Sequence, residues 1–504
     1  MLWNNTTGQI TQIIKRGAAT RINDLKFIAL ELTKFQSSPS YRDMITGERY
    51  YRGDHDILRR KRMVIGAGGE LEEVKNLPNN KIIDNQYGKL VDQKVNYLLA
   101  KPLTLETENE VYGKLLQTVF NKRFLRTLRN IGEDCLNGGI AWILPYYNEQ
   151  GVLAFKRFPS YEILPFWADD EHTVLDCAVR VYQIEAYEGS TEVTLIKVEI
   201  YDKQGIHRYE LKGETLIPDP DVDNPSEAYF TIKDSNDGTA KGYNWDKIPL
   251  VAFKFNTKEI PLIKRVKSLQ DGINDILSDF QNNMQEDSRN TILIIKNYDG
   301  TNLGEFRRNL SQYGAVKVKT TDGADGGVDT LEITVNAENY KVILEIFKKA
   351  LIENGRGFDA KDDRMSGNPN QMNIQSMYSD IDLDANGMET EYQAAFEELF
   401  WFVNMHFVNT GQGDFTGETV NVIFNRDILI NESESIDNCS KSVGILSNET
   451  IVSQHPWTSD VKLELKRLED EKAKAQEEMD EYRKAFGSTG NSDTGGGGGN
   501  VDET

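Results

Sequence analysis

Residues 261–290 constrain the fold of this 504-residue chain more than any other segment. Apolar side chains recur there every third or fourth residue, which places them in one stripe along a helix. The stripe consists of Val266, Leu269, Ile273, Ile276 and Phe280. The opposite face carries Asp271, Asn274, Asp275, Ser278, Asp279, Asn282 and Asn283. We therefore expect a helix with one side packed, as in the seam of a helical bundle, and the other side in water.

A second amphipathic helix is expected over residues 336–353. Its apolar face consists of Tyr340, Ile343, Leu344, Phe347 and Leu351. Shorter elements are expected between the two helices, namely strands at 291–296, 315–319 and 329–335 and a helix at 303–313. The sequence thus predicts a helical hairpin that is capped by a small α/β unit over residues 291–335.

The first half of the chain is expected to hold most of the β-structure. Residues 1–39 are predicted to be an N-terminal arm, and residues 40–260 an α+β region. A helical pattern near 87–100 is followed, over 140–255, by short alternating runs that Gly, Pro and Asp clusters interrupt. The predicted fold class is therefore α+β.

The last third of the chain is expected to be mainly helical. Residues 354–370 form a polar loop of about 17 residues, longer than most connections in compact domains. Residues 371–440 are predicted to hold a helix over 371–409, with Gly387 as a site for a kink, and a strand at 419–424. Residues 441–486 read as further helices, and the tail, 487–504, contains five consecutive glycines and is predicted to be disordered.

The charge of the chain excludes one class of function. With 58 Lys and Arg against 80 Asp and Glu, the formal net charge is −22, which argues against a protein that holds nucleic acid over its whole surface. Residues 250–365 are nearly neutral, with 17 basic and 18 acidic side chains. The net charge does not exclude local contact, and the central segment is the place to look for a bound polyanion. We find no transmembrane run or secretory signal, and three scattered cysteines fit a reducing compartment.

Motifs that would indicate an enzyme or a metal protein are not found in the sequence. There is no phosphate-binding G-x-x-x-x-G-K-[ST] loop, and the five histidines lack metal-ligand spacing. His406 is expected to be a hydrogen-bonded core residue. The side chains at 380, 382, 384, 386 and 391 have the spacing of a calcium loop, but Ala385 occupies the position that needs glycine. We predict no catalytic residue, no metal site and no cofactor.

Several segments, in a fixed order, carry a family resemblance. They are V-D-Q-K-V-N-Y-L-L-A-K-P at 91–102, K-N-Y-D-G at 296–300, G-G-V-D-T-L at 326–331, N-T-G-Q-G-D-F at 409–415, F-N-R at 424–426 and G-I-L-S-N-E-T at 444–450. No single segment is specific, but their ordered combination resembles the portal proteins of tailed bacteriophages, and specifically the SPP1-type family. Ala100 stands where that family has glycine.

The resemblance implies a fold and an assembly. Members of the family form a ring, usually of twelve copies, around a DNA channel at one capsid vertex. Residues 40–260 and 371–440 would form the wing, 261–290 and 336–353 two stem helices, 291–335 the clip, 354–370 the tunnel loop, and 441–486 a helical crown. The chain would be a structural protein of the virion, found in the host cytoplasm during assembly, and would not associate with membranes.

The resemblance also implies partners and site residues. Double-stranded DNA would be packaged through the ring by the terminase large subunit and later ejected, and the ring would contact major capsid, scaffolding and head-completion or connector proteins. Candidate DNA-facing cations are Lys348, Lys349, Arg356, Lys361 and Arg364. Candidate partner-facing residues of the clip are Lys296, Asn297, Tyr298, Arg307 and Arg308. The stripe from Val266 to Phe280 would pack against neighbouring subunits, with the polar face of its helix lining the channel.

Two alternatives stay open at the level of sequence. One is a cytosolic hydrolase whose carboxylates act with a divalent metal, because any of 80 acidic residues could pair in the fold. The other is a capsid-associated adaptor that oligomerises without a channel. The size and shape of the particle would separate these alternatives from a portal ring.

Overall fold

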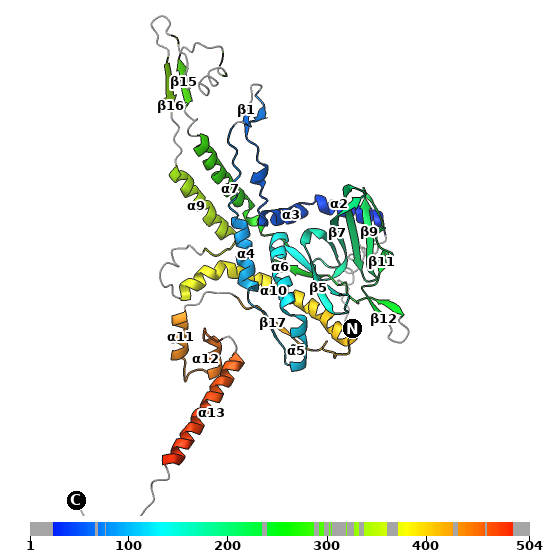
Figure 1. Cartoon of the computed structure of the whole chain (residues 1–504), viewed down its shortest axis with the longest axis vertical. Coiled ribbons are helices and arrows are strands. Elements are labelled where there is room, and N and C mark those ends of the chain that lie inside the picture. Colours follow the sequence, from blue (N-terminus) through cyan, green and yellow to red (C-terminus); the bar gives the residue numbers. More distant parts are fainter. Residues whose placement is uncertain are drawn as a thin grey trace, which may run out of the picture. The chain divides into compact units, whose positions relative to one another are not determined.

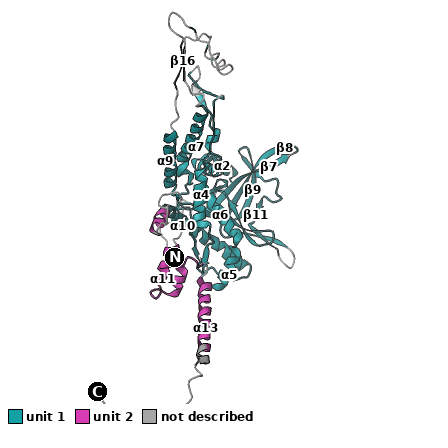
Figure 2. Ribbon diagram, turned by 60° about the vertical axis from the view of Figure 1, so that its left-hand side comes forward, with its two compact units in different colours: residues 1–359, 379–427 teal, residues 360–378, 428–504 magenta. Residues whose placement is uncertain are grey.

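The structure is a computed structural model, and it describes most of the chain. The described residues are 24–65, 69–75, 77–233, 239–286, 292–296, 302, 304, 319, 327–331, 337–359, 371–426, 432–458 and 461–486. They fall into two compact units (Figure 2). The first contains Met1–Asp359 and Ser379–Asp427, and the second contains Ala360–Tyr378 and Ile428–Thr504.

The helices of the first unit lie beside its sheets (Figure 1). They are α2 (Leu25–Ser37), α3 (Pro39–Tyr51), α4 (Gln86–Leu99), α5 (Glu110–Val119), α6 (Lys122–Gly138), α7 (Ile263–Glu286), α9 (Ala337–Asn354) and most of α10 (Gln371–Asn409), with short 3-10 helices η2 (Asp56–Arg59) and η3 (Ser160–Glu162). Local signals fix the ends of several of them. Asn121 caps α6 by accepting hydrogen bonds from the backbone N–H groups of Arg123 and Phe124, and Gly139 ends it at a φ of 83°.

The strands of the first unit form one larger sheet and several small ones. The larger sheet has the order β10 (Thr215–Pro218), β9 (Gly205–Lys212), β8 (Thr191–Asp202), β7 (Leu175–Glu188), β6 (Ile163–Trp167), with β11 (Ser226–Glu227) on β9. A second sheet has the order β14 (Val251–Lys254), β4 (Ile140–Tyr147), β5 (Leu153–Phe158). The antiparallel pairs are β1 (Met63–Ile65) with β2 (Leu71–Glu73), β12 (Phe230–Lys233) with β13 (Ala240–Tyr243), and β17 (Asn421–Ile423) with β3 (Thr104–Glu106).

The core of the larger sheet includes the first described helix. Ile28, Ala29 and Leu32 of α2 are buried in one cluster with Trp142 and Val179. The boundary expected at residue 39 is therefore wrong for residues 25–37, because their apolar stripe completes the core of the α+β region. Residues 1–23 lie outside the described part of the chain.

The helix predicted over 371–409 is confirmed, with bounds of Gln371–Asn409 for α10. Its C-terminal half is buried as expected, and Phe396, Phe402 and Val403 are at most 1% exposed. His406 is buried and its Nδ1 lies 3.2 Å from the Tyr147 hydroxyl, which confirms a core histidine. Burial lowers the pKa of His406, so the ring is neutral at physiological pH.

The two helices of the predicted hairpin are α7 and α9, which lie side by side in Figure 1. In the predicted inset, β15 (Ile292–Lys296) pairs antiparallel with β16 (Gly327–Leu331), so the strand expected at 329–335 begins two residues earlier, at Gly327, and residues 332–335 lie outside the described part of the chain. The short helix at 303–313 and the strand at 315–319 lie almost entirely outside the described residues. The loop residues 360–370 lie outside them as well.

The second unit contains α11 (Glu432–Lys441), α12 (Asn448–Gln454) and α13 (Val461–Phe486). The Ser447 side chain caps α12 by accepting a hydrogen bond from the backbone N–H of Thr450 at 3.2 Å. The helices expected in 441–486 are thus present, but α11 lies earlier than the pattern suggested, within the segment assigned to the wing. None of the helices that the structure describes combines the length and apolar character of a membrane span.

Candidate functional site where the helical hairpin meets the sheet domain

The apolar stripe of α7 is largely covered by the chain itself. Gly272 permits the close approach of α9, since a Cβ atom at this position would come within 2.5 Å of the Phe347 ring. Further along, the rings of Phe280 and Tyr340 lie 5.1 Å apart. Val266 and Ile273 are completely buried in a single subunit. Their predicted role as a ring-packing surface is therefore wrong, whereas for the partly buried Leu269, Ile276 and Phe280 it stays a prediction.

The polar face of α7 is partly buried, whereas the sequence predicted that it would lie in water. Four side chains on it, one turn apart, are at most 1% exposed: Gln270, Asn274, Ser278 and Asn282. They accept hydrogen bonds from backbone N–H groups of the segment that precedes α4 and of the first turn of α4. The donors are Tyr87 to Gln270 at 2.8 Å, Asp84 to Asn274 at 3.1 Å, Ile82 to Ser278 at 2.9 Å and Asn80 to Asn282 at 2.7 Å.

The geometry of this contact follows from two repeats. Four residues of α-helix advance about 6 Å, and two residues of an extended chain advance about 6.6 Å. A side chain at every fourth position of α7 therefore meets every second N–H of the segment from Asn80 to Asp84. We call these four side chains of α7 the polar ladder. It satisfies backbone groups that burial would otherwise leave without partners.

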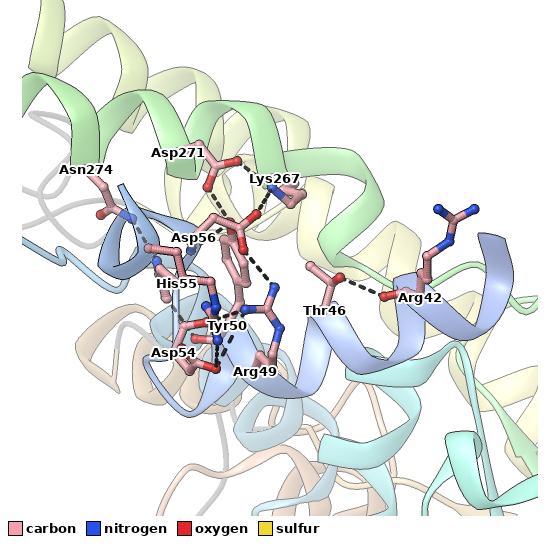
Figure 3. Close-up of polar contacts among 11 residues, drawn as sticks. Arg42, Thr46, Arg49, Tyr50, Asp54, His55, Asp56, Lys267, Asp271 and Asn274 are labelled. Atoms are coloured by element: carbon pink, nitrogen blue, oxygen red, sulfur yellow. Dashed lines mark hydrogen bonds and ion pairs between the residues drawn. The ribbon is translucent and has the colours of Figure 1, made fainter. Parts of the chain in front are cut away.

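A charged cluster ties the same helix to α3 (Figure 3). The Lys267 ammonium lies 2.7 Å from carboxylates of both Asp56 and Asp271, and the Tyr50 hydroxyl donates to Asp271 at 2.5 Å. Although burial opposes the effect, hydrogen bonds from Lys267 and Arg49 hold the pKa of Asp56 well below its usual range. The negative charges nearest to α3 are thus neutralised within the subunit.

His55 joins this cluster to the polar ladder. Its Nδ1 lies 2.8 Å from the Asn274 amide nitrogen, its Nε2 lies 3.0 Å from the Tyr50 carbonyl, and its ring stacks on Tyr50 (Figure 3). Burial lowers the pKa of His55. Since a neutral imidazole has one donor and one acceptor, both ring nitrogens have a partner at neutral pH.

Substitution of Asn274 by Leu is expected to lower the free energy of unfolding by about 3 kcal/mol, because Asp84 N–H and His55 lose their partner in a buried site. Chemical denaturation monitored by tyrosine and tryptophan fluorescence measures the loss. Leucine at the exposed Ser268 on the same helix is the matched control and should change stability by less than about 0.5 kcal/mol. Equal stability of the two variants would contradict a supporting role for the ladder.

Asp384 is the point at which four elements meet. Its carboxylate lies 2.8 Å from Lys94 of α4, 2.7 Å from Arg265 of α7 and 2.9 Å from Arg356, which follows α9. The side chains of Asp384 and Lys94 are only 6% and 3% exposed. Burial lowers the pKa of Lys94 to about 8. Burial would raise the pKa of Asp384, but the neighbouring Lys94 and Arg265 outweigh it and lower that pKa.

The residues that follow α9 are held against α4. The Gln93 side chain donates to the Phe358 carbonyl at 2.6 Å and accepts from the Phe358 N–H at 2.9 Å. Gly355 and Gly357 lie against Leu90, where a Cβ atom on either would come within 2.5 Å of a Leu90 methyl group. The predicted loop over 354–370 is therefore anchored up to Asp359.

The predicted DNA-facing cations differ in their surroundings. Arg356 has a φ of 51°, donates to Asp384, and accepts a hydrogen bond from Lys94 at its carbonyl, so it is not a mobile cation of the loop. Lys348 forms an ion pair with Asp84 at 2.6 Å. Lys349 is exposed on α9, and Lys361 and Arg364 lie outside the described residues.

The predicted clip residues fall mostly outside the described part of the chain. Lys296 ends β15, but its side chain is not among the described ones, and Asn297, Tyr298, Arg307 and Arg308 lie outside altogether. Their partner-facing role stays a prediction.

The carboxylates that are described do not form an open metal site. The calcium-loop pattern from Asp380 to Glu391 lies within α10, where Asp382, Asn386 and Glu389 bind Arg426. Elsewhere in the described residues, Glu210, Asp219 and Asp221 converge, but Lys197 occupies their centre at 3.3, 2.7 and 2.6 Å. In both groups a cationic side chain lies among the carboxylates.

Comparisons with a family profile and with known proteins agree on one family, the phage portal proteins. The sequence profile described as phage portal protein, SPP1 Gp6-like, matches residues 36–478. The portal protein of Bacillus phage SPP1 is 28% identical over 432 residues, which are 85% of this chain and 83% of that protein. The portal protein of Clostridium phage phiCD119 is 26% identical over 453 residues, 87% of this chain and 95% of that protein.

Solved structures give a more distant likeness. A chain in the neck of an empty GTA particle, computed with C6 symmetry, has a TM-score of 0.39 and 11% identity over 81% of this chain and 92% of its own length. A chain in the virion of a native gene transfer agent particle has a TM-score of 0.35 and 12% identity over 72% of this chain and 87% of its own length.

Proposed function

The chain belongs to the SPP1 Gp6-like family of phage portal proteins, and on this premise we propose that its copies close into a ring, with twelve as the expected number, around a channel for double-stranded DNA. The ring would occupy one vertex of the capsid. DNA would enter through it during packaging by the terminase motor and leave through it on ejection. In this role the protein is a structural channel rather than an enzyme.

The family match over residues 36–478 carries this proposal, because it includes the hairpin, the site and the second unit together. Within the ring, α7 and α9 would form the stem, the β15–β16 pair part of the clip, and α12 and α13 part of the crown. The wing would be formed by the sheets with α10. The clip would dock the terminase large subunit and later head-completion or connector proteins, while the rest of the ring would contact major capsid and scaffolding proteins.

Charge supports a channel that DNA can slide through. Arg60 forms ion pairs with both Asp275 and Asp279 of α7, at 3.2 and 2.9 Å, which reduces the negative charge of this part of the stem. A subunit with a net charge of −22 and a nearly neutral stem and clip would guide a duplex without binding it tightly, because each neutralised phosphate adds affinity.

The decisive experiment is to measure the mass and shape of the purified chain. We expect native mass spectrometry to give about twelve times the 57.2 kDa of one subunit, and electron-microscopic class averages to show a ring with a central hole. Oligomers without a hole would favour the adaptor instead. A single subunit under every assembly condition, including inside infected cells, would overturn the proposal.

Neutralising two cations of the loop tests DNA contact. Replacement of both Lys361 and Arg364 by Ser should leave rings intact and slow packaging of DNA into proheads about three-fold, because cations of the loop would centre the duplex. A variant with Ser at Lys472 and Lys474 on α13 loses the same charge elsewhere and should package normally. Equal packaging rates for the two variants would argue against loop–DNA contact.

A further inference from the structure

A broad groove lies within the first unit, away from the hairpin. It is bounded by the loop between β6 and β7, by residues 246–259 and by α10, and it has a volume of about 1400 Å³. This is larger than the cavities of roughly 300–1000 Å³ that enclose small ligands. Its size and open form suit a peptide segment.

The groove is acidic, and its lining also includes the apolar side chains of Val174, Leu175 and Ile248, which we call its apolar strip. Nine Asp and Glu residues line it, against four Lys residues. Two of those lysines are already paired within the groove, Lys247 with Glu398 at 2.9 Å and Lys254 with Glu259 at 3.1 Å. Val174, which is 56% exposed, adds apolar surface at the wall. A segment that combines positive charge with apolar side chains would be complementary to this surface.

The wall of the groove is rigid before any segment binds. The Asp169 carboxylate accepts hydrogen bonds from the N–H groups of Thr173 and Val174, and Lys254 donates to the His172 carbonyl at 3.0 Å. His172 and Glu259 both have positive φ values, 56° and 55°, and their side chains meet at 2.8 Å. A preformed wall lowers the ordering cost of binding.

The chain itself contains a segment of the required chemistry at its start. Residues 1–23 hold Lys15, Arg16 and Arg21 and not one Asp or Glu, in a chain whose net charge is −22. Ile10, Ile13 and Ile14 in the same segment have the spacing of one apolar helical face. The family match begins only at residue 36, so this segment lies outside it.

The described chain also begins next to the groove. The Phe27 ring of α2 lies 6.3 Å from the Phe166 ring, and Trp167, the next residue, lines the groove. Residues 1–23 can span up to about 75 Å when extended, so their length does not limit access. We propose that residues 1–23 dock into the groove of their own chain, with the basic side chains on its carboxylates and the isoleucines on its apolar strip.

Zero-length carbodiimide cross-linking of the full-length protein, followed by peptide mass spectrometry, tests this docking. We expect Lys15 to be joined to groove carboxylates such as Glu397, Glu398 or Asp170. Reversal of Arg16 and Arg21 to Glu, which keeps the reactive Lys15 amine, should reduce the yield about ten-fold, because attraction becomes repulsion across the groove. The matched control reverses two lysines of α13, Lys472 and Lys474, and should leave the yield unchanged.

A second measurement does not depend on cross-linking. Removal of residues 1–23 should increase hydrogen exchange in 168–174 and 391–398 while leaving exchange in α7 unchanged. Cross-links of Lys15 only outside the groove, or unchanged exchange after truncation, would overturn the proposal. So would cross-links that join only isotopically light to heavy chains in a mixed sample, since they would show docking on a neighbour. Neither result would affect the proposed ring.

Discussion

Replacement of both Val342 and Ile346 by Asp should convert the ring into single subunits that remain folded. These residues of α9 are 45% and 58% exposed, and Ile343 beside them is 43% exposed, so the helix presents apolar side chains that the described part of its own chain leaves uncovered. In a closed ring the same surface recurs on every subunit and can be buried between neighbours. Two carboxylates in such an interface would have to be desolvated without partners, at a cost of several kcal/mol at each contact.

Mass photometry measures this outcome as a fall from about twelve subunits to the 57.2 kDa of one. Thermal unfolding of the variant should stay within a few degrees of the wild-type subunit, because exposed substitutions usually change stability by less than about 0.5 kcal/mol. The matched control is replacement of the exposed Lys341 on the same helix by Asp, and this variant should still form rings. Rings from the double variant would place the interface elsewhere, for example on Leu269 or Ile276.

The choice of positions shows why the structure was needed. From the sequence, Ile273 is the natural residue to replace, since it lies in the middle of the predicted stripe. It is completely buried within one subunit, so Asp at this position would unfold the subunit instead of separating the ring. Periodicity predicts that a face is buried, but not whether the same chain or a neighbour covers it.

The elements that were predicted well are those in which local signals agree. The bounds of α10 follow from a long helical period and from the glycines and prolines outside it, and its aromatic half has too few polar residues to lie in water. The Ser447 cap at the start of α12 is a local signal of the same kind. For these elements, tertiary contacts only reinforce what the nearby sequence favours.

The polar ladder could not be predicted from the same signals. Gln270, Asn274, Ser278 and Asn282 recur at every fourth residue, and this spacing is the one sign that they share a partner. Their partner, the segment from Asn80 to Tyr87, lies about 190 residues earlier, and its pairing with α7 is set by the tertiary fold. The surroundings of Arg356 could not be predicted either, because the sequence shows its charge but not that the Asp384 carboxylate lies beside it.

Substitution of Asp384 by Ala should destabilise the first unit by about 3–5 kcal/mol, because it leaves the buried Lys94 without its counter-ion. We expect the melting temperature to fall by roughly 10 °C. Hydrogen exchange in 354–359 should rise as well, since Arg356 loses its anchor. The matched control is replacement of the exposed Asp380 on the same helix by Asn. It removes one carboxylate from the surface and should change the melting temperature by no more than about 2 °C.

The pH dependence of this loss distinguishes an electrostatic anchor from simple packing. Asp384 raises the pKa of Lys94, while burial lowers it to about 8 in the intact site. Without Asp384 that pKa falls further below its unfolded value, so between the two values the unfolded variant binds more protons than the folded one, and stability rises with pH. The loss of stability in the variant should therefore be smaller at pH 9 than at pH 6.5.

The double variant Lys94→Met with Asp384→Leu should recover part of the lost stability, since Arg265 and Arg356 are exposed enough to reach water. A deficit independent of pH, with no recovery in the double variant, would mean that Asp384 acts through shape alone.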